Sequence, residues 1–118
     1  MKTLVIGASP NPLRYAFKAV RALRKHDIEV VAIGKRETVI EDVQVIKDKP
    51  WIEDLHTVTL YVGPQNQGSY IDYILSLKPK RIIFNPGTYN EDLIMQAEQA
   101  GIDCVRDCTL VMLAADSY

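Results

Sequence analysis

Cysteine and histidine are scarce in this sequence, which limits the chemistry that it can carry. The 118 residues include two cysteines, Cys104 and Cys108, and two histidines, His26 and His56. Two cysteines are too few for a disulfide framework, and a zinc site needs more ligands. The histidines lie at a predicted helix end and before a predicted strand, away from any loop that could hold a nucleophile. We therefore expect neither a metal site nor a Ser–His–Asp set.

Long hydrophobic runs and an excess of charge of one sign are also absent. No apolar run reaches the roughly 18 residues of a membrane helix, and Met1-Lys2 leads into a short strand pattern instead of a signal-peptide core. The formal net charge is -1, so the chain as a whole does not attract polyanions. We expect a cytoplasmic protein without a membrane or nucleic-acid partner, and any anion site must be local.

The sequence does contain a regular alternation of strand and helix patterns. The apolar run 3–6 predicts a strand, and apolar residues at helical spacing between Leu13 and Leu23 predict a helix that ends near residue 25. The β-branched run 28–33 predicts the next strand. Residues 43–46 alternate only briefly between flanking charges, which predicts a short edge strand.

The second half of the chain continues this alternation. Residues 57–62 and 81–85 are predicted strands, and each is followed by a helix pattern. The second of these helices begins either with Asn90 as its N-cap or with Thr88 and Glu91 as a capping box.

Gly101 is expected to end that helix in the left-handed conformation. Residues 103–105 form a last predicted strand before a short apolar tail at 110–115. Near-continuous apolar strands separated by helices are typical of a parallel sheet covered on both faces. We predict the α/β class: one three-layer, Rossmann-like doubly wound domain over residues 1–118, with a mainly parallel sheet of five to six strands.

In such a fold, ligands bind in the loops at the carboxyl ends of the strands, and the first of these loops has a distinctive pattern. Gly7, Ala8 and Ser9 offer backbone N–H groups and a hydroxyl to a phosphate at a helix N-terminus. However, Ser9 and Pro12 replace the second and third glycines of G-x-G-x-x-G, and Pro10 and Pro12 have no N–H. This pattern disfavours a pyrophosphate lying flat along the turn. The alternative is that Gly7 serves only the turn.

The loop after the second strand discriminates between nucleotide classes. An NAD site usually has a carboxylate there, whereas this chain has Gly34, Lys35 and Arg36, with Glu37 only after them. Two cations favour a ribose that carries its own phosphate, as in NADP or coenzyme A. The alternative is that Lys35 and Arg36 are solvated surface charges.

Four tyrosines also lie near the loops of the expected cleft: Tyr61, Tyr70, Tyr73 and Tyr89. A tyrosine ring could cover an adenine base, although ordinary packing explains these residues equally well.

The sequence resembles the small stand-alone CoA-binding domain proteins, which are similar to the N-terminal domain of the succinyl-CoA synthetase alpha subunit. Three segments between Lys2 and about Met112 carry the resemblance, namely VIGASPNPLRYAFKAVRALRKHDIEVVAI, TLYVGPQNQ and FNPGTYNEDLIMQAEQAGIDCVRDC. It implies a Rossmann-like fold in which the first loop takes the CoA phosphates and the second takes the adenosine end. It does not imply ligase activity, because the synthetase phosphorylates a histidine in a second domain that has no counterpart here.

The resemblance and the loops together imply a set of ligand contacts. These residues match the family's contact positions or stand beside them: Gly7, Ala8, Ser9, Pro10, Asn11, Arg14, Gly34, Lys35, Arg36, Val62, Gly63, Pro64, Gly87 and Cys108. Two segments depart from the family. Ile33-Gly34-Lys35 replaces a usual Val-Asn-Pro turn, and Asn85-Pro86-Gly87 replaces Gln-x-Gly.

We therefore expect a protein that binds coenzyme A or an acyl-CoA and that shows no catalytic constellation of its own. Two alternatives stay open. An NADP-binding oxidoreductase-like domain is disfavoured by the broken glycine pattern, and a protein-interaction module with a vestigial cleft is kept open by the Gly34-Lys35 departure. A homodimer and an unidentified protein partner also stay open.

Overall fold

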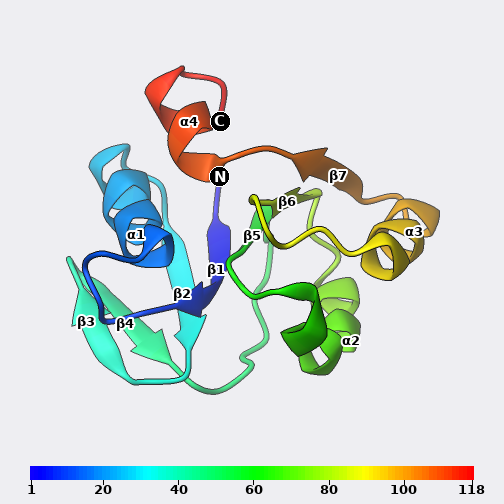
Figure 1. The fold of residues 1–118 in the computed structure, drawn as a ribbon, viewed down its shortest axis with the longest axis horizontal. Coiled ribbons are helices and arrows are strands. Elements are labelled where there is room, and N and C mark those ends of the chain that lie inside the picture. The colour runs from blue at the N-terminus through cyan, green and yellow to red at the C-terminus, as the bar shows by residue number, and fades with distance from the viewer.

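A seven-stranded sheet with helices on both faces forms the centre of the computed structural model, which describes residues 1–118 (Figure 1). The strands are β1 (Thr3–Ala8), β2 (Val30–Gly34), β3 (Thr38–Ile40), β4 (Val43–Ile46), β5 (Thr57–Leu60), β6 (Arg81–Phe84) and β7 (Asp103–Arg106). The helices are α1 (Tyr15–Lys25), α2 (Gly68–Leu77), α3 (Glu91–Gln99) and α4 (Thr109–Ala114), with a 3-10 turn η1 (Pro64–Asn66). None of the helices has the length and apolar character needed to cross a membrane.

The strand order identifies where a ligand site is expected. The sheet runs β3-β4-β2-β1-β5-β6-β7, and all neighbours are parallel except β3 and β4. Strands β2, β3 and β4 lie on one side of β1, and the chain then crosses to the other side, where β5, β6 and β7 lie. The order therefore reverses between β1 and β5, which is where doubly wound sheets bind their ligands. The predicted α/β, Rossmann-like fold class is confirmed.

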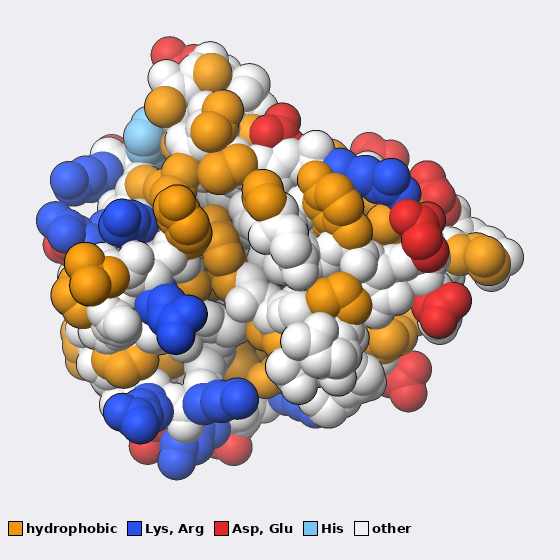
Figure 2. All heavy atoms as spheres, in the orientation of Figure 1, with side chains coloured by type: hydrophobic (Ala, Val, Ile, Leu, Met, Phe, Trp, Pro, Cys, Tyr) orange, Lys and Arg blue, Asp and Glu red, His pale blue; other side chains and the backbone are white.

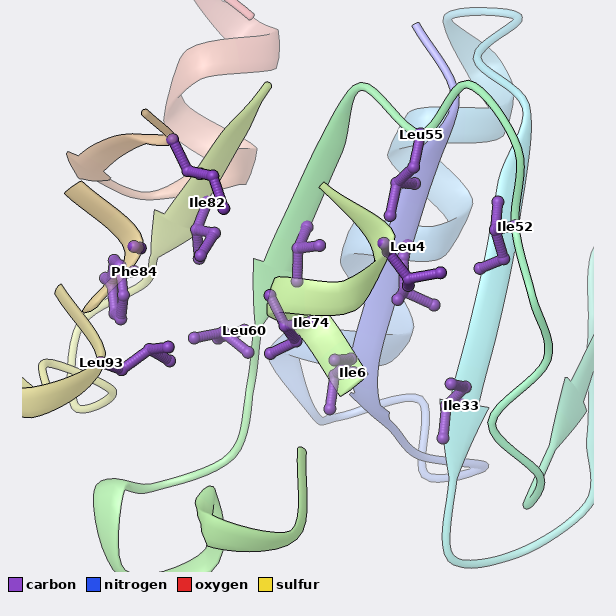
Figure 3. Close-up of a cluster of buried hydrophobic side chains, with 14 of the residues drawn as sticks. Leu4, Ile6, Ile33, Ile52, Leu55, Leu60, Ile74, Ile82, Phe84 and Leu93 are labelled. Carbon is purple, nitrogen blue, oxygen red and sulfur yellow. The ribbon is translucent and has the colours of Figure 1, made fainter. Parts of the chain in front are cut away.

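Each face of the sheet buries its own hydrophobic core. Successive strand residues point to opposite faces, so Leu4 and Ile6 pack toward α2 and α3, whereas Val5 packs toward α1 and α4. The segment between β4 and β5 has no helix, yet it covers part of the first face with Ile52 and Leu55 (Figure 3). Both faces are therefore covered across the sheet, as a parallel sheet requires.

The β3 strand was not predicted, and this accounts for two errors in the sequence-based prediction. β3 pairs antiparallel with β4 through a tight turn at Glu41 and Asp42, where Glu41 has a φ of 55°. A strand of three residues carries too little periodicity to be recognised. The sheet consequently has seven strands instead of five to six, and Val43–Ile46 lies between β2 and β3 instead of at an edge.

Two ion pairs attach the β3–β4 turn to α1. Arg24 donates to both carboxylate oxygens of Asp42 at 2.8 Å each, and Arg21 donates to Glu41 at 3.0 Å. The hydrogen bonds from Arg24 hold the pKa of Asp42 below its usual value. Because these groups are exposed, the pairs orient the hairpin more than they stabilise the fold.

The observed ends of the helices show which of the predicted start and stop signals the structure uses. Asn90 caps α3 by accepting from the N–H groups of Asp92 and Leu93, so the Asn90 alternative is confirmed. Gly101 follows this helix with a φ of 81°, as predicted. The first helix begins at Tyr15 and not at Leu13, and Leu13 is 80% exposed and contributes nothing to the buried face. The apolar tail forms the short helix α4.

Gly34 provides a test of how closely the strand ends pack. A Cβ atom there would collide with the carbonyl oxygen of Ala8 and touch Val45, so we expect Gly34→Ala to lower the free energy of unfolding by about 1–3 kcal/mol. Gly68→Ala is the matched control, because no atom lies within 4 Å of the added methyl group and alanine favours a helix. Urea denaturation of both variants measures the difference, and an unchanged midpoint for Gly34→Ala would contradict the close approach.

His56 generates a prediction about pH. Burial and the neighbouring charges of Arg81 and Lys80 lower the pKa of His56 in the folded protein below its usual value of about 6.5. The unfolded chain then takes up a proton more readily than the folded one. The contribution of neutral His56 to the free energy of unfolding is complete above a pH of about 6.5. It is lost as the pH falls toward the lowered pKa of His56 in the folded protein.

We expect the urea midpoint of the wild type to decrease over that pH range and His56→Gln to reduce the decrease. His26→Gln, at the exposed end of α1, is the comparison variant because it retains His56. Identical pH profiles for His56→Gln and the wild type would show that His56 does not contribute.

Candidate functional site

A cleft with a volume of about 900 Å³ opens at the carboxyl edge of the sheet, at the point where the strand order reverses. The loops after β1, β2 and β5 and the beginnings of α1 and α2 form its walls. The lining residues are Gly7, Ala8, Ser9, Pro10, Asn11, Arg14, Tyr15, Ala16, Gly34, Lys35, Arg36, Tyr61, Val62, Gly63, Asn66, Ser69 and Tyr70. This volume is within the range of cofactor sites.

Two glycines allow the backbone to form one end of the cleft. Gly7 has a φ of 99°, and a Cβ there would lie 2.8 Å from the carbonyl oxygen of Tyr61 and 2.9 Å from Cγ2 of Val62. A Cβ on Gly34 would overlap the carbonyl oxygen of Ala8. The ends of β1, β2 and β5 therefore approach more closely than larger residues would permit.

The loop between β1 and α1 is held by short hydrogen bonds within itself. Ser9 Oγ accepts from the Asn11 N–H at 3.1 Å, and Asn11 Oδ1 accepts from the Leu13 N–H at 3.0 Å. The Asn11 carbonyl accepts from the Arg14 N–H at 3.0 Å. These bonds, with the restricted φ of the two prolines, define the path by which the chain enters α1.

The N-terminus of α1 faces the cleft without a capping side chain. Arg14 occupies the N-cap position and makes no side-chain cap hydrogen bond, and the first turn contains no acidic residue. By contrast, α3 has Asn90 as its cap and begins with Glu91 and Asp92. The first N–H groups of α1 and the positive end of its dipole are therefore free to receive an anion. The first turn of α2, which also reaches the cleft, has no acidic residue either.

Three cationic side chains and no carboxylate line the cleft. Arg14 stands at the start of α1, whereas Lys35 and Arg36 follow β2, so the positive charge is placed at two separate points. Figure 2 shows Lys and Arg gathered on the side of α1 and Asp and Glu gathered toward α3. A chain with a net charge of -1 thus has a locally positive cleft. No three His, Cys, Asp or Glu side chains come together as a metal site.

Tyrosines contribute the aromatic surface of the cleft. Of the four predicted from the sequence, Tyr61 and Tyr70 line it, and Tyr15 does so as well. Lys49 lies 5.1 Å from the centroid of the Tyr70 ring and donates to the carbonyl of Ser69, which holds this wall of the cleft. Tyr73 and Tyr89 do not line the cleft, and the Tyr73 hydroxyl instead donates to the Pro50 carbonyl at 2.7 Å.

The hydroxyl of Tyr61 is buried without a hydrogen-bond partner. The hydroxyls of Thr59 and Thr109 lie near it, but they bond to each other at 2.8 Å. Burial raises the pKa of Tyr61 above its usual value.

All but three of the residues predicted from the sequence line the cleft. Pro64 begins η1, Gly87 lies in the loop after β6 with a φ of 89°, and Cys108 precedes α4. Gly87 and Cys108 follow strands on the far side of β5, away from the point where the strand order reverses. Sequence reasoning missed Tyr15, Ala16, Asn66 and Ser69. The only available signal for Asn66 and Ser69 was their place after a buried strand.

Comparison with known proteins agrees with this geometry. The family model described as CoA binding domain matches residues 1–114. The solved structure of an uncharacterized protein is 48% identical with a TM-score of 0.96, covering 99% of this chain and 97% of that chain. A hypothetical protein from Pyrococcus horikoshii OT3 is 25% identical with a TM-score of 0.82, covering 96% of this chain and 81% of that chain. No curated protein matches.

The fold also occurs inside a larger enzyme. A dinucleotide forming acetyl-coenzyme A synthetase 1 of Ca. Korarchaeum cryptofilum, solved with phosphate and ADP, is 14% identical with a TM-score of 0.76. The match covers 90% of this chain but only 25% of that chain, and it shows a shared fold alone. The family match, together with the cleft at the strand-order reversal, establishes that this chain belongs to the CoA binding domain family.

Proposed function

We propose that this protein binds coenzyme A, or an acyl-CoA, in the cleft at the carboxyl ends of β1, β2 and β5. The observation that carries the proposal is the charge of the cleft, which contains Arg14, Lys35 and Arg36, an uncapped helix N-terminus and no carboxylate. Coenzyme A carries its negative charge in two places, on a pyrophosphate and on a ribose 3′-phosphate. The two separate groups of positive charge in the cleft correspond to this arrangement.

The pyrophosphate is assigned to the N-terminus of α1. Gly7, Ala8 and Ser9 would supply backbone N–H groups and a hydroxyl, and Arg14 would supply a cation at the same end. Hydrogen bonds to charged groups contribute about 1.5–3 kcal/mol each, more than neutral ones. The prolines at positions 10 and 12 remove two donors, so the phosphates would approach the first turn of the helix instead of lying along the loop.

The 3′-phosphate is assigned to the loop after β2. Lys35 and Arg36 are exposed there and line the cleft, and neither makes an ion pair. An NAD ribose would need a carboxylate acceptor at this place, and none lines the cleft. The adenine would then lie near Tyr15 of α1 or Tyr70 of α2, which both line the cleft.

The remaining predicted contacts are assigned to the thiol end of the ligand. Gly87 and Cys108 lie beyond the cleft, after β6 and β7. A pantetheine arm would have to extend past β5 to reach them. The proposal assigns no reaction to this chain.

NADP is the second candidate ligand, because the cations after β2 would also receive a 2′-phosphate. The loop after β1 argues against it, since Ser9 and Pro12 replace two of the glycines that a flat dinucleotide pyrophosphate requires.

Isothermal titration with CoA, 3′-dephospho-CoA, NADP and NAD tests the proposal. We expect CoA to bind most tightly, and we expect removal of its 3′-phosphate to weaken binding by about 1–3 kcal/mol because a charge-assisted contact is lost. Lys35→Ala should cost a similar amount with CoA but almost nothing with 3′-dephospho-CoA, since the two changes remove the same contact. Ser9→Ala should weaken both ligands alike.

Lys25→Ala is the matched control, because it removes the same charge from the other end of α1. Tighter binding of NADP than of CoA would replace the proposal by an oxidoreductase-like one. If none of the four ligands binds, the family's ligand is not retained, and protein partners become the subject of the search.

A further inference from the structure

Gln67 is a fully buried polar residue that lies near the cleft but does not line it. Gln67 is 0% exposed and occupies the N-cap position of α2, but its side chain does not cap that helix. Its amide nitrogen donates to the carbonyl of Val62 at 2.9 Å and to the carbonyl of Thr88 at 2.8 Å. Its amide oxygen accepts from Asn90 Nδ2 at 3.0 Å. Both N–H donors and the oxygen are therefore paired.

These three bonds join a wall of the cleft to a part of the molecule that does not line it. Val62 lines the cleft, and its Cγ2 packs so closely on Gly7 that a Cβ atom there would lie 2.9 Å from it. On the other side, the Thr88 hydroxyl donates to the carbonyl of Asn85 at 2.7 Å, and Asn90 caps α3. The loop after β6 is thus a fixed support to which Gln67 attaches the wall.

The wall formed by Val62 and Gly63 has few other attachments to neighbouring elements. β5 ends at Leu60, and the Tyr61 N–H makes the last bond to the sheet, to the carbonyl of Ile6 at 2.8 Å. Beyond it, the Asn66 N–H bonds to Gly63 within the same loop. Gln67 is therefore the side chain whose hydrogen bonds connect Val62 to the loop after β6.

A buried amide is well suited to this task. Replacing it with an apolar side chain leaves the carbonyls of Val62 and Thr88 without their donor beside a fully buried position, which is costly. The loop would then move to find other partners. Because hydrogen bonds are directional, a satisfied buried network selects one loop conformation more strongly than apolar contacts of the same size.

We infer that Gln67 is a positioning residue for the ligand site, and that it sets the separation between the Val62–Gly63 wall and Gly7. This inference rests on the proposed function of the cleft. The loop after β6, with Gly87, would influence ligand affinity through Gln67 without touching this part of the ligand.

The test compares Gln67→Met with Gln65→Met. Both changes remove an amide of similar size, but Gln65 is exposed and makes no hydrogen bond through its side chain to a neighbouring element. Titration with CoA should show a dissociation constant raised about tenfold or more by Gln67→Met and within about twofold of the wild type for Gln65→Met.

Amide hydrogen exchange of the ligand-free protein, followed by NMR, separates positioning from general stability. Gln67→Met should speed exchange at Asn66, which lies in the loop, and at Asp92 and Leu93, whose amides are capped by Asn90. The amides of β1 and β2 should keep their protection. Faster exchange throughout the chain would overturn the inference in favour of a purely stabilising role.

The two proposals fail in distinguishable ways. If the wild type does not bind CoA, the proposed function fails and the inference about a ligand site fails with it, whatever the exchange data show. If the wild type binds CoA and Gln67→Met binds it equally well, only the inference is overturned.

If Gln67→Met does not fold, Asn90→Asp tests the same connection. It keeps an oxygen to cap α3 and removes the amide donor to Gln67. We expect it to raise the dissociation constant for CoA about threefold, and an unchanged constant would overturn the inference.

Discussion

The close approach of three strand ends is the constraint on which the cleft depends. Gly7 and Gly34 lack the Cβ atoms that would collide with Tyr61 and Ala8, so the backbones after β1, β2 and β5 meet at one place. Because this place is also where the strand order reverses, the helix that follows β1 begins beside it. The open N-terminus of α1 and the cations after β2 then face the same space. Larger residues at the two glycine positions would separate these parts.

Polar groups hold the carboxyl edge of the sheet together, while apolar side chains hold its middle. Asn85 donates to Thr59 and to the carbonyl of Leu60 and accepts from the Thr109 N–H, so it joins β5, β6 and α4. Gln67 makes the corresponding connection between the loops that follow β5 and β6. Buried amides suit this edge because the loops present unpaired backbone groups, which apolar packing alone would leave unsatisfied.

The electrostatics of the cleft are local and do not follow from the total charge. A chain with nearly equal numbers of acids and bases has three cations and no carboxylate lining the cleft, and many of its carboxylates lie toward α3 (Figure 2). The acidic residues of α3 complement the dipole of that helix, whereas the dipole of α1 has no such partner within the chain. The positive end of the helix dipole is thus compensated by acidic residues at α3 and is left uncompensated at α1.

The amino-acid sequence by itself determined the fold class, the order of most elements and the loops that form the cleft. Those features depend on local patterns: apolar runs mark strands, helical spacing marks helices, and loops after strands share one edge of a parallel sheet. Only the tertiary structure decided which loops meet. It showed that the short strand β3 places Val43–Ile46 inside the sheet, and that α2 turns Ser69 and Tyr70 toward the cleft. It also showed that Gly87 and Cys108 lie beyond the cleft, and that Gln67 is buried between two loops. These outcomes depend on contacts between segments far apart in the chain, which no local pattern encodes.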